Sequence, residues 1–149
     1  MVMLFTISCN NKQDNSVPLD NRTFDDRDYY LGEALTKGDT SAYFQFSTMD
    51  YPKYDLLYPA LTMANKYQYH LAYYDVYDAL TSPSYSFKSN SGIKNLDNES
   101  RTMALDYLKR GAEKGNKECK RILGNLYLEG KYIEKDTIKG KQLIEEGEH

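Results

Sequence analysis

Histidine is the side chain in this sequence best suited to acid–base chemistry near neutral pH, and the chain holds two, His70 and His149. His70 lies among tyrosines in a helix-patterned segment, where an imidazole acts as a general base only beside a nucleophile and an orienting group. The sequence indicates neither, because it contains no Gly-x-Ser-x-Gly elbow, phosphate loop, dinucleotide fingerprint or paired cysteines. We therefore expect no catalytic residue and no cofactor, which means that the protein is not expected to be an enzyme.

Metal-ligating side chains do not occur at any familiar spacing. The sequence has no CxxC or HExxH motif. The acidic cluster Asp25, Asp26 and Asp28 lacks the glycine and the terminal glutamate that a calcium loop needs. Negative charge at the start of a helix is the simpler account of this cluster, and we expect no metal site.

Tyrosine is in excess, with 15 Tyr against 5 Phe and no Trp. The rings of segment 67–80 are too many for one buried helix face, so some are expected to point outward. They either replace phenylalanine in a shallow, hydrated core or form a recognition surface, in which tyrosine is common. Two further aromatic residues on a polar loop favour the recognition surface. The residues predicted to bind a partner are Tyr67, His70, Tyr73, Tyr74, Tyr77, Asp78, Tyr85 and Phe87.

The composition limits the class of protein and partner. A chain of 149 residues with 40% hydrophobic and 28% charged residues is typical of one globular domain. The net charge is −3, with an acidic first half and a mildly basic remainder. Nucleic-acid binding needs lysine and arginine gathered on one face, so DNA and RNA are not expected partners.

The N-terminus carries the only targeting signal. An apolar run over residues 1–8 ends at Cys9 and is followed by a polar, aperiodic stretch to residue 22. The run resembles the end of a bacterial lipoprotein signal peptide, which implies lipidation of Cys9 and a periplasmic or envelope location. The alternative is a disordered leader on a cytoplasmic protein. Residues 1–22 are therefore expected to be a signal remnant and tether, and Cys119 to be a lone, buried thiol.

From Phe24 onward, hydrophobic residues return at three- and four-residue steps, with few β-branched runs. Asn98 and Asp136 are expected to cap helices, and Gly115 to end one in the left-handed conformation. The pattern predicts an all-α domain over 23–149, with a loop at 81–97. The expected helices are 25–36, 40–49, 56–66, 67–80, 98–114, 117–128 and 137–146.

The spacing of small and large apolar residues in the last third is more specific than that of a general amphipathic helix. These residues are Ala104, Leu108, Ala112, Cys119, Leu123, Gly124 and Tyr127. In order and spacing the stretch resembles a Sel1-like repeat of the tetratricopeptide type, clearest over 99–147. The resemblance implies closely packed helical hairpins, with the named residues at the contact.

Two earlier, diverged copies can be aligned with this repeat. Residues 37–42 parallel 114–119, and Asn65 set in step with Gly115 puts Tyr69 opposite Cys119 and Tyr77 opposite Tyr127. The expected fold class is therefore a short α/α solenoid of about three diverged helical-hairpin repeats, with about seven helices. A non-repeat bundle over 24–80 is the alternative.

These expectations favour a protein-binding module. The resemblance to small Sel1-like lipoproteins implies an immunity-type inhibitor that occludes a secreted toxic effector in the bacterial envelope. The alternative is an envelope scaffold or assembly adaptor that gathers several protein partners. In either role the chain would contact a membrane only through a lipid anchor at Cys9.

Overall fold

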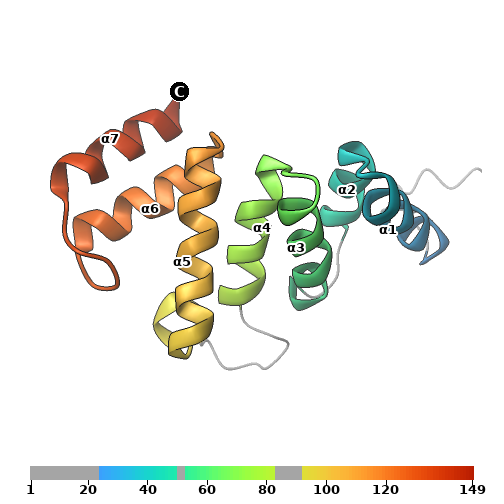
Figure 1. Ribbon diagram of the computed structural model, residues 1–149, viewed down its shortest axis with the longest axis horizontal. Helices are drawn as coiled ribbons and strands as arrows, with labels where there is room; N and C mark the ends of the chain where they lie inside the picture. The colour runs from blue at the N-terminus through green and yellow to red at the C-terminus, as the bar shows by residue number, and fades with distance from the viewer. Residues whose placement is uncertain (1–23, 50–52, 83–91) are drawn as a thin grey trace, which may run out of the picture.

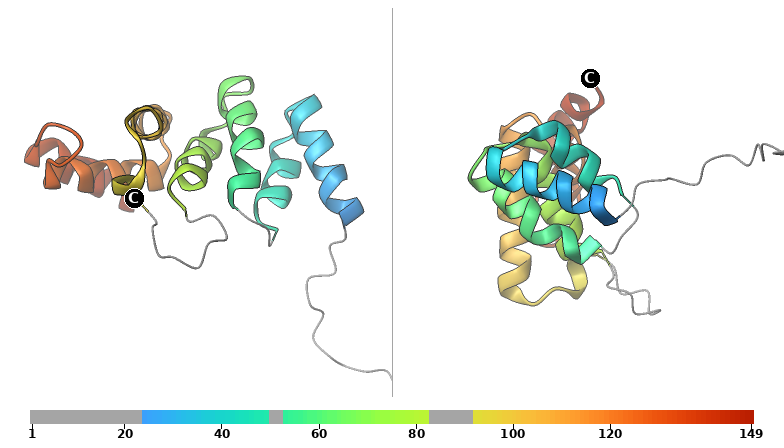
Figure 2. Two further views of the ribbon diagram at one scale, coloured as in Figure 1. Left: turned by 90° about the horizontal axis from the view of Figure 1, so that it is seen from below. Right: turned by 90° about the vertical axis from the view of Figure 1, so that its right-hand side faces the viewer.

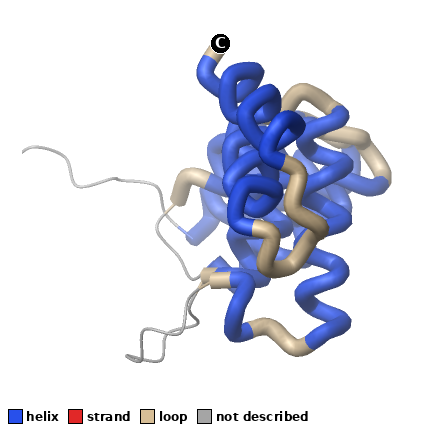
Figure 3. The backbone as a smooth tube through the Cα atoms, turned by 90° about the vertical axis from the view of Figure 1, so that its left-hand side faces the viewer, coloured by secondary structure: helices blue, strands red, loops and turns tan. Residues whose placement is uncertain are grey.

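A computed structural model describes residues 24–49, 53–82 and 92–149 of the chain (Figure 1). These residues form helices and connecting loops without any β-strand (Figure 3). The α-helices are α1 (Phe24–Lys37), α2 (Thr40–Ser47), α3 (Leu57–Asn65), α4 (His70–Thr81), α5 (Asn98–Glu113), α6 (Lys117–Glu129) and α7 (Thr137–Glu148). Short 3₁₀ helices, Lys53–Leu56 and Ile93–Asn95, precede α3 and α5. The predicted all-α class is therefore confirmed for the described residues.

The helices follow one another along the long axis of the molecule, from α1 at one end to α7 at the other (Figures 1 and 2). Short turns join α1 to α2, α3 to α4, and α5 to α6, and each of these pairs is in contact. Helix α4 also packs on α5, and α7 lies along α6. The result is a row of helical pairs closed by a single helix, which is the arrangement of a short α/α solenoid.

Helix boundaries differ from the sequence prediction by up to three residues, and α7 extends two residues beyond its predicted end, to Glu148. Helix α4 begins at His70 and not at residue 67, because Tyr69 occupies the extended cap position. Helix α5 is capped by Asp97, whose carboxylate accepts a hydrogen bond from the Ser100 N–H at 2.9 Å, whereas Asn98 is already helical. Helix α2 ends at Ser47, two residues earlier than expected.

The three helical pairs share a common turn. A residue with positive φ lies in the turn of each pair, directly before the cap of the second helix, namely Gly38 (φ 71°), Gln68 (φ 56°) and Gly115 (φ 83°). The next residue is the cap of the second helix, and a small buried residue follows three positions after that cap. The caps are Asp39, Tyr69 and Asn116, and the small residues are Ala42, Ala72 and Cys119.

This turn corrects the expected alignment of the middle copy. Tyr69 corresponds to the cap Asn116, and Ala72, not Tyr69, lies opposite Cys119. The prediction was shifted by three residues because the middle turn uses Gln68, a residue rarely found at positive φ, where the other turns use glycine. The Gln68 amide donates to the Asn65 carbonyl at 2.8 Å, which holds the turn.

The core runs continuously through the helical pairs. Its largest fully buried side chains include Tyr43, Phe46, Met63, Tyr73 and Leu108. The predicted repeat-packing residues Ala104, Leu108, Ala112, Cys119, Leu123 and Gly124 are all buried. Tyr127 is half-buried, with the Lys139 ammonium 4.7 Å from its ring centroid.

Several predictions fall on residues that the structure does not describe. They are the signal remnant and tether over 1–22, the lipidation site Cys9, and the loop residues Tyr85 and Phe87. Among the described residues, no helix combines the length and the apolar character that crossing a membrane requires. The same residues bring together no group of three or more histidine, cysteine, aspartate or glutamate side chains that could hold a metal ion.

Candidate protein-binding groove

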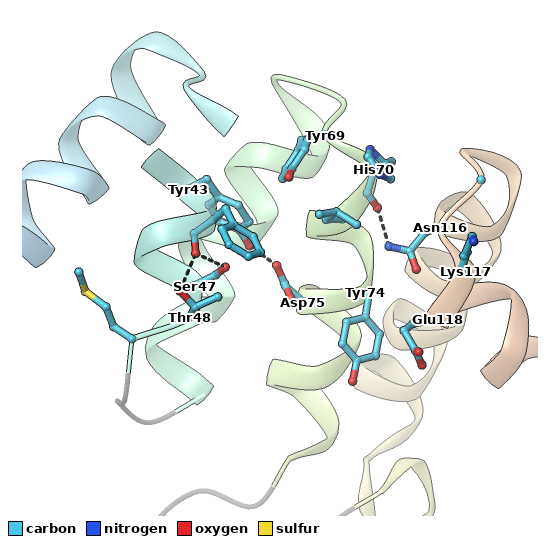
Figure 4. Close-up of a pocket in the computed structure, with 14 residues that line it drawn as sticks. Tyr43, Ser47, Thr48, Tyr69, His70, Tyr74, Asp75, Asn116, Lys117 and Glu118 are labelled. Carbon is cyan, nitrogen blue, oxygen red and sulfur yellow. Dashed lines mark hydrogen bonds between the residues drawn. The ribbon is translucent and has the colours of Figure 1, made fainter. Parts of the chain in front are cut away.

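The second helices of the three pairs enclose an open groove. The first wall comes from residues between 43 and 49, in α2 and directly after it. The second comes from residues between 69 and 75, at the start of α4, and the third from residues 115–118, at the start of α6 (Figure 4). The cavity volume is about 640 Å³. We name it the α2/α4/α6 groove. Because the walls come from the second helices of three successive pairs and the segments next to them, the groove is a product of the stacking and not of one helix.

A carboxylate lies at the centre of the groove. Asp75 of α4 is half-buried, and its Oδ2 accepts a hydrogen bond from the Tyr43 hydroxyl of α2 at 2.7 Å (Figure 4). Tyr43 itself is buried and packs edge-on against Tyr69, with ring centroids 5.8 Å apart. The hydrogen bond therefore ties two neighbouring helical pairs together across the floor of the groove.

Aromatic and aliphatic side chains surround this carboxylate. Phe44 and Leu71 line the groove and are 51% and 38% exposed. Tyr69 and Tyr74 also line it and are half-buried, and the His70 ring lies edge-on to Tyr69. The groove thus exposes apolar surface next to a charge, which is typical of a surface that a partner covers.

Burial and charge both act on the two groove tyrosines. Burial raises the pKa of Tyr69, and the nearby Asp75 carboxylate raises it further. Burial also raises the pKa of Tyr74, as do the charges of Asp78, Glu118 and Asp75. Both phenols therefore stay protonated at neutral pH and are available as hydrogen-bond donors.

Asn116 fixes the third wall of the groove. Its side-chain oxygen caps α6 by accepting from the Cys119 N–H at 2.9 Å, and its amide donates to the His70 carbonyl at 3.0 Å (Figure 4). The residue is only 3% exposed. One side chain thus sets the position of α6 relative to α4.

We expect Asn116→Ala to lower the free energy of unfolding by about 1–2 kcal/mol, because it removes a helix cap and leaves the His70 carbonyl without this donor. Urea denaturation measures the change. Asn116→Asp keeps the cap acceptor but loses the amide donor, so it should fall between the wild-type protein and the alanine variant. Equal stabilities of the Asp and Ala variants would contradict a role for the cap.

The sequence-predicted residues separate in the structure. His70 and Tyr74 line the groove, while Tyr77 and Asp78 do not. Tyr73 is fully buried, with its hydroxyl donating to the Gln68 side chain at 3.1 Å, so its predicted place on a partner-binding surface is wrong. Tyr67 is also occupied within the fold, because its hydroxyl lies 2.9 and 3.0 Å from the Leu35 and Thr36 carbonyls at the end of α1.

Sequence reasoning missed two residues that line the groove, Phe44 of α2 and Asp75 of α4. Phe44 lies next to Tyr43 and off the buried stripe formed by Ala42, Tyr43 and Phe46, so a helical wheel of α2 would have shown it as an outward aromatic residue. Asp75 is an acidic residue within an aromatic helix, which is a second available signal. Neither of these sequence signals indicates which side of α4 faces α2.

Comparison of the chain with protein-family models, with curated proteins and with solved structures found no match in any of the three. The resemblance to Sel1-like repeats therefore stays a prediction from the residues that carry it. The common turn of the three helical pairs is an observation of the structure and stands without it.

The thiol beside the groove is not a nucleophile. Cys119 is fully buried at the contact of α5 and α6, and burial, with smaller effects of Asp75 and Glu118, raises its pKa to about 12. The thiolate, which is the reactive form, is therefore scarce at neutral pH.

We expect Cys119 in a Cys9→Ser variant to resist a thiol reagent such as Ellman's reagent in native buffer at pH 8, and to react fully in denaturant. Absorbance of the released thiolate gives the extent and rate of the reaction. Rapid labelling of the folded protein would contradict the burial of this side chain.

Proposed function

We propose that the protein is a non-enzymatic, protein-binding helical repeat module and that the α2/α4/α6 groove receives its partner. One observation carries the proposal, namely the groove of about 640 Å³ in which the exposed rings and aliphatic side chains of two helical pairs surround Asp75. Aromatic side chains at the centre of a concave surface contribute most of the free energy in many protein interfaces. Solenoid proteins commonly bind partners along such surfaces.

The partner-binding residues proposed for the described part of the chain are revised accordingly. Phe44, Tyr69, Leu71, Tyr74 and Asp75 form the proposed contact surface, with His70 at its edge. This set keeps two of the sequence-predicted residues, His70 and Tyr74, and replaces Tyr67, Tyr73, Tyr77 and Asp78 by neighbours that reach the groove.

The two envelope roles expected from the sequence, inhibitor and scaffold, are more specific versions of this proposal. An immunity-type inhibitor of a secreted effector would hold one partner tightly, because an effector that escapes is toxic. An envelope scaffold would bind several partners with lower affinity. A dissociation constant in the nanomolar range for a single partner supports the inhibitor, and micromolar binding of several partners supports the scaffold.

The groove is tested by two variants and one matched control. Proteins that the chain captures in a pull-down from bacterial envelope extract are identified by mass spectrometry and purified. Their affinity for the chain is then measured by isothermal titration calorimetry. We expect Phe44→Ala and Tyr74→Ala to weaken binding by about tenfold or more. Tyr58→Ala is the control, because Tyr58 is a 70% exposed aromatic residue outside the groove and should leave the affinity unchanged. A larger loss from Tyr58→Ala than from the groove variants would move the interface elsewhere.

The envelope location is a separate proposal that rests on Cys9 and the apolar run before it. We expect Cys9→Ser to move the protein from the membrane fraction to the soluble fraction of a bacterial host, because the serine hydroxyl does not take the lipid. Immunoblotting of the two fractions gives the result. An unchanged distribution would remove the lipid anchor from the proposal.

A further inference from the structure

We propose that Gln68 is a positioning residue of the α2/α4/α6 groove, because its side chain holds the turn between α3 and α4 in the conformation that places the Tyr69 ring on the groove wall. This inference rests on the proposed function, since it concerns the shape of the same site. Gln68 itself does not line the groove and makes no proposed contact with the partner. It acts through Tyr69.

The backbone of Gln68 has a conformation that costs free energy. Its φ of 56° lies in the left-handed region, which brings the Cβ of a residue close to the following carbonyl oxygen. Within residues 24–49, 53–82 and 92–149, Gln68 is the only residue other than glycine with a positive φ, and the other two turns use Gly38 and Gly115. A conformation of this kind persists where the surrounding structure enforces it, and such residues are common at binding sites.

The glutamine side chain makes two hydrogen bonds that a glycine could not make. Its Nε2 donates to the Asn65 carbonyl oxygen at 2.8 Å, and its Oε1 accepts from the Tyr73 hydroxyl at 3.1 Å. Asn65 is the last residue of α3, and Tyr73 is fully buried in α4. One side chain therefore joins the two helices across the turn between them.

The partners of Gln68 are themselves fixed by α5. The Asn65 amide donates to the Tyr107 hydroxyl at 2.6 Å, and its Oδ1 accepts from the Arg110 guanidinium at 3.0 Å. The same guanidinium lies 5.2 Å from the centroid of the Tyr73 ring. The Gln68 side chain is thus held by groups whose positions depend on the packing of α5 against α3 and α4.

The turn that contains Gln68 is the longest of the three. It spans residues 66–69, whereas the other pairs are joined by residues 38–39 and 114–116. Tyr67 holds its other side, because the ring lies against Gly38 and the hydroxyl lies 2.9 Å from the Leu35 carbonyl oxygen. A longer connection has more conformations available, so it needs more contacts to keep a single one.

The residue after Gln68 is the one that reaches the groove. Tyr69 lines the groove and packs edge-on against the Tyr43 ring of α2 (Figure 4). Its backbone is extended and precedes α4, and its N–H donates to the Met63 carbonyl oxygen at 3.0 Å. Because Tyr69 lies outside the helix, the direction of its side chain depends on the conformation of the turn that Gln68 holds.

Gln68→Gly tests this role, because it gives the middle turn the residue type of the other two and removes both side-chain hydrogen bonds. Relief of the left-handed conformation and loss of the hydrogen bonds oppose each other, so the urea midpoint should change little. The Tyr69 ring should become more mobile. In protein labelled with 3-fluorotyrosine, the fluorine resonance of Tyr69, assigned with Tyr69→Phe, should move toward its position in the unfolded chain.

The effect on binding is measured with short peptides selected from a random display library on the full chain. Peptides that lose affinity with Phe44→Ala and Tyr74→Ala are groove ligands, and fluorescence polarisation gives their dissociation constants. We expect Tyr69→Ala to weaken these peptides by about tenfold. Gln68→Gly should weaken them by about two- to tenfold, since a mobile side chain has to be ordered again on binding.

A double variant and a matched control separate positioning from a general loosening of the turn. If Gln68 acts through Tyr69, Gln68→Gly combined with Tyr69→Ala should bind no more weakly than Tyr69→Ala alone, whereas additive losses would overturn the inference. Lys66→Gly is the control, because it adds a glycine to the same turn at negative φ (−81°) and keeps both hydrogen bonds of Gln68. It should leave the affinity and the Tyr69 resonance unchanged, and an effect as large as that of Gln68→Gly would contradict a specific role of Gln68.

The outcomes separate this inference from the proposed function. Groove ligands that bind Gln68→Gly as tightly as the wild-type protein, or that tolerate Tyr69→Ala, keep the groove as a binding site and overturn the positioning role. A lower urea midpoint with unchanged affinity assigns Gln68 to the stability of the fold alone and overturns it as well. If no peptide depends on Phe44 or Tyr74, the proposed function itself fails and the inference fails with it.

Discussion

Tyr73→Ala is expected to lower the free energy of unfolding by about 3–5 kcal/mol, because it removes a large, fully buried ring from the centre of the core. The ring packs near Tyr107 at 6.1 Å between centroids and under the Arg110 guanidinium, and its hydroxyl donates to Gln68. All of these contacts join α4 to α5 or to the turn before α4. Their loss should weaken the connection between the middle and last helical pairs.

Urea denaturation followed by circular dichroism measures this change, and the neighbouring tyrosine is the control. Tyr74→Ala should cost only about 1 kcal/mol, in proportion to its partial burial, while it weakens partner binding. Tyr73→Phe keeps the ring and loses only the hydrogen bond to Gln68, so it should cost about 1 kcal/mol and remain folded. A Tyr73→Ala protein as stable as Tyr74→Ala would contradict the burial of Tyr73.

This pair of residues shows what periodicity could and could not predict. The crowding of rings in segment 67–80 indicated that some had to face outward, and the structure has both kinds, Tyr73 inside and Tyr74 at the groove. One helix does not show which side meets its neighbours, because that depends on α2 and α5 as well. The burial of Tyr73 follows from α5 packing on α4, a contact between residues far apart in sequence.

The helices themselves were largely predictable because their signals are local. Asp39, Asn116 and Asp136 are polar caps, and each accepts hydrogen bonds from the first turn of the following helix. The start of α4 lacks such a signal, since Tyr69 caps it without a side-chain hydrogen bond and Gln68 takes the place of glycine. The error in the repeat alignment arose at this turn.

The groove was less predictable than the helices, since it depends on pairing across repeats. The hydrogen bond between Tyr43 and Asp75 joins residues 32 positions apart, and nothing in either helix alone indicates it. Phe44 could have been identified from its position off the apolar stripe of α2, because an outward phenylalanine has no role in the core. The structure leaves its side chain 51% exposed.

Gly111→Ala is expected to lower the free energy of unfolding by about 1–3 kcal/mol, although alanine favours a helix more than glycine does. A methyl group at position 111 of α5 would lie 2.9 Å from the Tyr73 Cβ and 3.1 Å from the Cys119 Cβ, and closer still to the Cys119 sulfur. The crowding involves the two neighbouring helices, α4 and α6, whose packing leaves little freedom to shift. Thermal and urea unfolding measure the loss.

Gly32→Ala is the matched control, because Gly32 lies within α1 and its added methyl group would meet nothing within 4 Å. This variant should gain about 0.5–1 kcal/mol from the helix preference alone. The expected order of stability is therefore Gly32→Ala above the wild-type protein and Gly111→Ala below it. The reverse order would contradict the close approach at Gly111.

Comparison of the helical pairs suggests a second substitution that should offset part of the stability lost in Gly111→Ala. Counted from the residue of positive φ, Gly111 and Cys119 correspond to Ala34 and Ala42 in the first pair, and Cys119 corresponds to Ala72 in the second. The last pair thus has a glycine on α5 where the first pair has alanine, and a cysteine sulfur on α6 where the others have a methyl group. Because the added methyl and the sulfur compete for one space, the double variant Gly111→Ala with Cys119→Ala should lose less stability than the two single losses combined, by about 0.5–3 kcal/mol. Strictly additive losses would show that the two positions do not share this space.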